Sequence, residues 1–111
     1  MDVFHDGGHE HSHESLKYFE KHVVKFIKEH PVQRVHINDR RVFSMEIVCV
    51  DAVILLSGTG ASYPGTAPHA ACKILEVLGV PEYDAKIVYE KDDLMFHFTH
   101  DGKYKTYVFG R

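Results

Sequence analysis

Residues 32–56 read VQRVHINDRRVFSMEIVCVDAVILL, and this stretch decides the expected fold. Two runs rich in β-branched residues, 32–37 and 42–50, lie on either side of Asn38 and Asp39. Asparagine and aspartate tolerate the backbone geometry of tight turns, and β-branched side chains fit the pleated surface of a sheet. The pattern therefore predicts a β-hairpin with its turn near these two residues.

The apolar run continues beyond the hairpin, from Ile47 to Leu56, and only Asp51 interrupts it. Residues 53–56 show little alternation, which is typical of a strand covered on both faces. The whole run is about half of the ~20 residues that a membrane-spanning helix needs. We therefore expect a buried strand and no membrane partner, with Asp51 at a bulge or bend.

One amphipathic helix is predicted on each side of this region. Before it, apolar residues recur at three- and four-residue steps over about 14–30, and Pro31 disfavours helical geometry at the residue that precedes it. After it, Pro68 suits the first turn of a helix, and Gly79 can adopt the left-handed geometry that ends one. We expect the second helix to extend from Pro68 to Leu78.

The C-terminal part reads as three further strands, 85–90, 94–99 and 103–109. The last two flank Asp101 and Gly102, and an Asp-Gly pair between alternating aromatic runs is a strong hairpin signal. The elements together predict an α+β fold in the order α-β-β(-β)-α-β-β-β, with two helices on one face of a mainly antiparallel sheet of five or six strands. This order resembles the profilin-like and roadblock-type arrangements, in which helices pack on a meander sheet that often serves dimerisation.

Both faces of the predicted C-terminal strands carry apolar side chains. Phe96 and Phe98 alternate with His97, and Tyr107 alternates with Val108. Helices on one side leave the other face uncovered, and a large exposed apolar face is typical of an interaction surface. The sequence therefore predicts a homodimer, and a non-catalytic homodimeric interaction module is one functional hypothesis.

The length and composition of the chain limit its domain organisation, its partners and its location. The chain has 111 residues, which suits one domain, and we expect residues 14–111 to form it behind a flexible His-rich arm, 1–13.

The formal net charge of -3 gives no field that attracts nucleic acid, so we expect no nucleic-acid partner. Cys49 and Cys72 are too few for a disulfide framework, and the opening residues do not resemble a secretory signal. The expected location is the cytoplasm.

The segment from Ser57 to Thr66 is rich in glycine and hydroxyl side chains and precedes the second predicted helix. Glycines let backbone N–H groups approach an anion, and the following helix adds the positive end of its dipole. Thr66 stands where a phosphate-binding P-loop requires lysine, so the segment is not a Walker A loop. The alternative is a long connection whose glycines serve turn geometry. We expect a small anionic ligand to contact Ser57, Gly58, Thr59, Gly60, Ser62, Gly65 and Thr66.

His69 and Cys72 lie on one face of the second predicted helix, together with Lys73 and Glu76. A cysteine near a helix start can have a lowered pKa, and a neighbouring histidine can deprotonate it. Cys72 is therefore a candidate nucleophile assisted by His69, and Asp51 is a candidate general base. The alternatives are a solvated helix side with an incidental cysteine, and an aspartate that ends a strand at the surface. The pattern does not decide whether the protein is an enzyme.

Four of the ten histidines lie in the predicted arm, at His5, His9, His11 and His13. Neutral imidazole binds divalent Zn, Ni and Cu, and several flexible donors can surround one ion. A metal-binding or metal-delivery protein is therefore a further hypothesis. Ordering such an arm costs conformational entropy, and structural zinc sites generally include cysteine, which weighs against it. The leading hypothesis is a small cytoplasmic binding domain that holds an anionic ligand at the glycine-rich segment.

Overall fold

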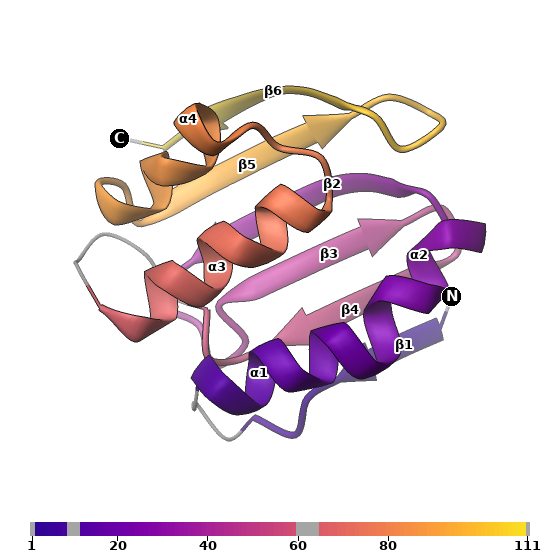
Figure 1. Ribbon diagram of the computed structural model, residues 1–111, viewed down its shortest axis with the longest axis horizontal. Helices are drawn as coiled ribbons and strands as arrows, with labels where there is room; N and C mark the ends of the chain where they lie inside the picture. Colours follow the sequence, from indigo (N-terminus) through magenta and orange to yellow (C-terminus); the bar gives the residue numbers. More distant parts are fainter. Residues whose placement is uncertain (1, 9–11, 60–64, 111) are drawn as a thin grey trace.

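The computed structural model describes residues 2–8, 12–59 and 65–110, and it confirms the α+β class (Figure 1). Its centre is a six-stranded sheet in the order β1-β4-β3-β2-β5-β6. Every neighbouring pair is antiparallel except β1 and β4, which are parallel. The strands are β1 Asp2–His5, β2 Val32–Asn38, β3 Met45–Cys49, β4 Ala52–Leu56, β5 Asp93–Phe98 and β6 Tyr104–Phe109.

Helical segments cover one face of this sheet (Figure 1). The first runs from α1 to α2 with a π-helical turn between them, and the second is α3. A short helix, α4, leads into a 3₁₀ turn before β5. The bounds are α1 Ser12–Tyr18, π-helical turn Phe19–Val23, α2 Val24–Glu29, α3 Thr66–Val77, α4 Glu82–Ala85 and 3₁₀ turn Lys86–Tyr89. Within the described ranges, no helix is both long enough and apolar enough to cross a membrane.

The core lies between the helices and the sheet. Period-two alternation directs Val35 and Ile37 of β2 and Phe96 of β5 toward the helices, and all three are fully buried. Phe19 of the π-helical turn and Leu75 of α3 close the core from the helical side. Full burial of one such side chain stabilises the fold by about 1.5–3 kcal/mol. The two predicted amphipathic helices are thus confirmed, with their apolar sides on the core.

The meander of β2, β3 and β4 confirms the predicted hairpin but divides its second arm. The chain turns back at Val50 and Asp51, both exposed, so residues 53–56 belong to a separate strand that pairs with β3. One long buried strand and two buried strands joined by a short turn give similar apolar runs, so periodicity does not distinguish them. The bend expected at Asp51 is in fact a full reversal.

Two glycines have the backbone geometry that the sequence predicts. Gly79, with φ 101°, donates its N–H to the carbonyl oxygen of Glu76 at 3.0 Å just after the end of α3. Gly102, with φ 87°, donates its N–H to the carbonyl oxygen of Thr99 at 2.9 Å in the turn between β5 and β6. Left-handed geometry costs residues with a Cβ atom about 1–2 kcal/mol, which explains glycine at both positions.

Of residues 85–90, predicted as a strand, residues 85–89 are helical and Glu90 is in a turn. The carbonyl oxygen of Pro81 accepts the N–H groups of Asp84 and Ala85 at 3.0 and 2.9 Å, which starts α4. Ala85 and Val88 are fully buried, and their three-residue spacing puts both side chains on one side of the 3₁₀ turn. The short apolar run fits strand and helix alike, and the helix start at Pro81 decides between them.

The first residues also differ from the predicted flexible arm, because Asp2–His5 form β1 at the edge of the sheet. The N–H of Asp2 donates to the carbonyl oxygen of Asp51 at 3.1 Å, and the N–H of Asp6 donates to that of Leu55 at 3.2 Å. Strand pairing uses backbone groups that every residue except proline carries. A four-residue exposed strand therefore leaves too short a side-chain pattern to be detected in the sequence.

Candidate functional site

The first half of the glycine-rich segment is organised around the carboxylate of Asp6. Asp6 follows β1 directly, and Ser57 follows the neighbouring β4. Ser57 donates its N–H to Asp6 Oδ2 at 2.9 Å and its hydroxyl to the two carboxylate oxygens at 3.0 and 3.1 Å. Ser15 donates its hydroxyl to Oδ2 at 2.5 Å, and Gly8 donates its N–H to Oδ1 at 3.1 Å. A carboxylate of the protein itself therefore accepts the hydrogen bonds that the sequence pattern predicts for an anionic ligand.

Neighbouring donors of the segment are also paired inside the protein. The N–H of Gly58 donates to Ser15 Oγ at 2.8 Å, and the N–H of Thr59 donates to Ser44 Oγ at 3.2 Å. Both serines and Thr59 are buried. The described N–H groups at the start of the segment therefore serve internal hydrogen bonds.

The electrostatics of this network favour a charged carboxylate. Partial burial on its own raises the pKa of Asp6, but hydrogen bonds from Ser15, Ser57 and Gly8 outweigh the burial and lower the pKa below its ordinary value of 3.8. Asp6 is therefore ionised at neutral pH. Its negative charge disfavours a second anion beside it.

Of the remaining predicted ligand residues, Gly60 and Ser62 fall outside the described residues, and Gly65 and Thr66 lie at the start of α3. Gly65 and Thr66 are exposed, and the Thr66 hydroxyl oxygen accepts a hydrogen bond from the hydroxyl of Ser12 at 3.4 Å. The structure therefore separates an interior part of the predicted set from a surface part. Ligand contacts in the surface part stay a prediction.

His69 and Cys72, the predicted catalytic pair, line one small cavity of about 190 Å³. Cys72 is 6% exposed and lies beyond the first turn of α3. Burial, together with the hydrogen bond from its thiol to Glu76 at 3.6 Å, raises the pKa of Cys72 to about 11. The thiol is therefore protonated at neutral pH, which disfavours it as a nucleophile. The other lining residues are Lys73, Glu76, Glu82, Lys86 and Tyr89.

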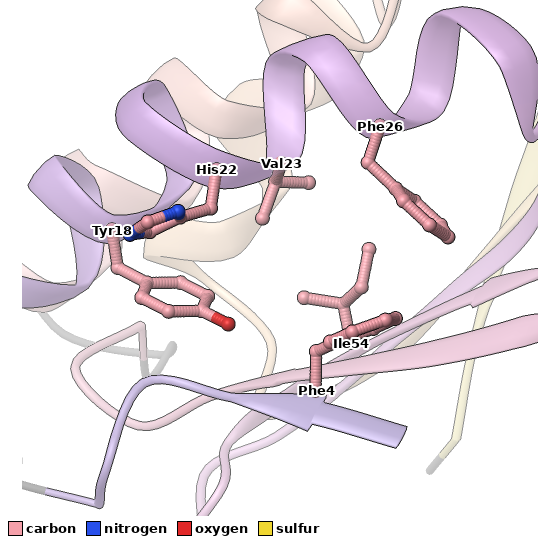
Figure 2. A pocket seen from close by; sticks show the side chains of 6 residues that line it. All are labelled: Phe4, Tyr18, His22, Val23, Phe26 and Ile54. Atoms are coloured by element: carbon pink, nitrogen blue, oxygen red, sulfur yellow. The ribbon is translucent and has the colours of Figure 1, made fainter. Parts of the chain in front are cut away.

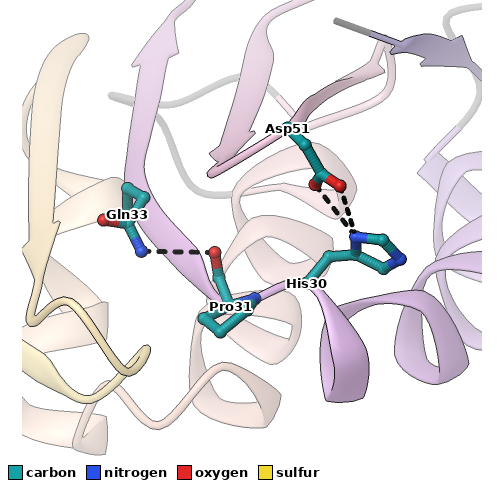
Figure 3. Close-up of polar contacts among 4 residues, drawn as sticks. All are labelled: His30, Pro31, Gln33 and Asp51. Atoms are coloured by element: carbon teal, nitrogen blue, oxygen red, sulfur yellow. Dashed lines mark hydrogen bonds and ion pairs between the residues drawn. The ribbon is translucent and has the colours of Figure 1, made fainter.

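Asp51 lies at the surface in the turn between β3 and β4 (Figure 3). Its side chain is 56% exposed, and both carboxylate oxygens lie 2.9 Å from Nδ1 of His30. The His30 ring stacks on Phe26, with ring centres 3.9 Å apart. Asp51 and Ser57 flank opposite ends of β4, so the structure does not bring Asp51 to the glycine-rich segment. The geometry supports the alternative in which Asp51 ends a strand at the surface.

The four predicted histidine ligands are divided between different elements. His9 and His11 lie outside the described residues. His5 is on β1, where Nδ1 accepts the N–H of Gly7 at 3.1 Å, and His13 is exposed in α1. Over residues 2–8, 12–59 and 65–110, no cluster of three or more His, Cys, Asp or Glu side chains is arranged to hold a metal ion. Binding of Zn, Ni or Cu by the histidine cluster stays a prediction.

All helical segments of the described chain lie on one side of the sheet, so the opposite side, here named the open face, is uncovered (Figure 1). Two rows of side chains cross the open face, because paired residues on neighbouring strands point to the same side. From β1 to β6, the first row is Val3, Val53, Val48, Arg34, His97 and Thr106. In the same direction, the second row is His5, Leu55, Glu46, His36, Met95 and Val108.

The open face has a polar centre between two apolar flanks. Its centre lies on β3 and β2, where His36 Nε2 approaches Asp93 Oδ1 of β5 at 2.9 Å. Neither Arg34 nor Glu46, also in the centre, forms an ion pair with another residue that the structure describes. The flanks, named apolar flanks for Val3, Val53 and Leu55 on β1 and β4 and for Met95 and Val108 on β5 and β6, also carry His5, His97 and Thr106. Val48 is the one apolar residue of the centre. The β1 part of this surface depends on a long-range parallel pairing and has no local sequence signal.

Comparison of the chain with protein-family models, with curated proteins and with solved structures finds no match.

Proposed function

We propose that the protein is a homodimeric interaction module that binds a second copy of itself through the open face. The observation that carries this proposal is the distribution of side chains, with the polar centre on β3 and β2 and an apolar flank on either side. Such a dimer has a two-fold axis that runs parallel to the strands, above the boundary between β3 and β2. The axis places β4 of one copy over β5 of the other, and β1 of one copy over β6 of the other. Each apolar flank then meets the other flank of the second copy, with Leu55 against Met95, and the polar centres meet each other.

The apolar flanks provide the surface that association removes from water. Val3 and Val108, on the two edge strands, are 59% and 55% exposed. Under the proposed symmetry each row faces the same row of the second copy, so Leu55 lies opposite Met95, while Val3 lies opposite Thr106 with Val108 in the neighbouring row. Two sheets that pack face to face interdigitate such side chains across a layer about 10 Å thick. Burial of apolar surface is the main favourable contribution to an association of this kind.

The polar centre is complementary to itself. β2 of one copy lies over β3 of the other, so Glu46 faces His36 of the second copy, and Arg34 of that copy lies in the neighbouring row of the same strand. Arg34 and Glu46 carry opposite charges at neutral pH, and such pairs across an interface fix its register and disfavour other partners. The charge pattern therefore favours a second copy of this chain over an unrelated protein.

Two further observations support a non-catalytic module in the cytoplasm. Cys49 and Cys72 are both free and buried, as is usual for proteins of reducing compartments. The raised pKa of Cys72 and the exposed position of Asp51 disfavour both as reactive groups.

A charge exchange across the open face tests the dimer. Sedimentation equilibrium would give the dimer dissociation constant of the wild type, Arg34→Glu, Glu46→Arg and the double variant. Each single change brings like charges close to each other across the interface, and each is expected to weaken the dimer about tenfold or more. The double variant restores opposite charges and is expected to recover the affinity. A wild-type chain that stays monomeric at every concentration, or a double variant no tighter than the singles, would contradict the proposal.

A matched pair of lysine substitutions serves as the control for position. Val53→Lys places a charge on the apolar flank of the open face, and Val77→Lys places one on α3, where Val77 is already 56% exposed. Burying an unpaired charge in an interface is costly, so only Val53→Lys is expected to dissociate the dimer. Equal effects of the two variants would show that the open face is not the interface.

A further inference from the structure

A cavity of about 270 Å³ lies between the first helical segment and the β1 edge of the sheet (Figure 2). It is on the helical side of the sheet, so it is separate from the open face. Side chains from β1 and β4 form its floor, and side chains from the helical segment form its roof. The lining residues are Phe4, Tyr18, His22, Val23, Phe26 and Ile54.

The floor of the cavity arises because β1 extends the sheet beyond the main core. Phe4 pairs with Ile54 across β1 and β4, so both side chains point toward the helices. Ile54 is 1% exposed, whereas Phe4 on the edge strand is 38% exposed. The Phe4 ring meets Phe26 of α2 edge to face, with ring centres 5.2 Å apart. These two rings form an aromatic wall beside the opening.

The roof of the cavity contains the π-helical turn Phe19–Val23. Tyr18, His22 and Phe26 follow one another at four-residue steps along the cavity side of this segment. A π-helical turn adds a residue to the regular helix, and such turns occur frequently at functional sites. The local geometry is therefore of a kind that proteins often use to position side chains around a ligand.

Tyr18 directs a polar group into this apolar space. Figure 2 shows its hydroxyl pointing into the gap between the helical segment and β1. The hydroxyl makes no hydrogen bond with another residue in the described part of the chain, while the ring lies against His22 with centres 4.9 Å apart. Burial and the negative charge of Asp6 raise the pKa of Tyr18, so the hydroxyl stays neutral and can donate or accept a hydrogen bond. The same negative charge disfavours an anionic ligand.

We propose that this cavity binds a small, neutral aromatic molecule, with its rings against Phe4 and Phe26 and a hydrogen-bond acceptor on the Tyr18 hydroxyl. An apolar cavity of about 150 Å³ accommodates benzene. The larger volume of about 270 Å³ therefore suits a compound of two fused rings. Apolar walls with a small number of placed polar groups, here the Tyr18 hydroxyl and the His22 ring, are the usual composition of a small-molecule site, in which the polar groups set the orientation of the ligand.

Quinoline and naphthalene are matched two-ring probes for this site, because quinoline carries a nitrogen acceptor and naphthalene carries neither an acceptor nor an N–H donor. Binding to the intact protein would be followed by NMR through the methyl resonances of Val23 and Ile54. Both probes are expected to shift these resonances. Tyr18→Phe removes only the hydroxyl and is expected to weaken quinoline binding about two- to tenfold while leaving naphthalene unchanged.

Two substitutions on β1 separate the cavity from general effects on the strand. Phe4→Ala removes part of the aromatic wall and is expected to weaken both probes. Val3→Ala alters the neighbouring residue on the open face and is expected to leave both affinities unchanged. Tyr83→Phe, at a tyrosine that is 80% exposed, is the control for loss of a hydroxyl. Methyl resonances that neither probe moves, or equal quinoline affinity in the wild type and Tyr18→Phe, would overturn the proposal.

Discussion

Asp6 and Asp51 lie at opposite ends of the pair formed by β1 and β4, and their surroundings differ. Asp6 accepts hydrogen bonds from two backbone N–H groups and two serine hydroxyls. Asp51 pairs with His30, and its side chain is 56% exposed. In the sequence the contrast is reversed, because Asp51 interrupts an apolar run while Asp6 stands among polar residues. The role of a carboxylate here depends on the donors that strand pairing brings to it, more than on its neighbours in sequence.

The largest effect on stability is expected for Asp6→Ala. The substitution removes the acceptor of Ser57 and Gly8 N–H groups and of the Ser15 hydroxyl. A hydrogen bond to a charged group contributes about 1.5–3 kcal/mol, so we expect the free energy of unfolding to fall by about 2 kcal/mol for this partly exposed site. Urea denaturation at neutral pH would measure the change. A loss no larger than that of Asp51→Ala would remove the distinction between the two aspartates.

Acid should reduce the contribution of Asp6 in a defined direction. Because hydrogen bonds lower its pKa in the folded state below the ordinary value of 3.8, the stabilisation is fully present above that value and is lost as the pH falls through the folded pKa. The difference in unfolding free energy between wild type and Asp6→Ala is therefore expected to be constant near neutral pH and to shrink below pH 3.8. Denaturation at a series of pH values would test this, and a difference that grows in acid would contradict it.

The smallest effect is expected for Asp51→Ala. An exposed ion pair contributes about 0.2–1 kcal/mol and is screened by salt. We therefore expect a loss below about 1 kcal/mol that decreases further at high ionic strength. The same urea measurement, with and without added salt, would detect it. A large loss that salt does not reduce would mean that His30 and its stacking on Phe26 depend on Asp51.

Elements with strong local signals were predictable from the sequence. The second helix ends where Gly79 adopts its left-handed geometry, and the last hairpin turns at Gly102. Both signals come from a few adjacent residues, and the backbone requirement at each is met by glycine. The α+β class followed from the order of these elements along the chain.

Features that depend on distant pairing were not predictable in the same way. β1 is short and exposed, and the contact of Asp6 with Ser57 exists only because β1 lies beside β4. The sequence alone therefore shows the glycine-rich segment without the carboxylate that its serine binds. Residues 85–90 differ from the prediction for another reason, because a short apolar run does not distinguish a strand from a helical turn.

The parallel pairing of β1 also bears on the order of folding. Each β1 residue pairs with a residue 50 positions later, as Val3 does with Val53, whereas β3 and β4 are joined by a short turn. Contacts between distant residues carry a larger loop-closure cost, so the meander can assemble before β1 docks. Native-state hydrogen exchange should therefore release the amide protons of β1 ahead of those of β3. The same opening would carry Phe4 away from the helical segment, so the last step of folding and the first step of access to the cavity would be one motion.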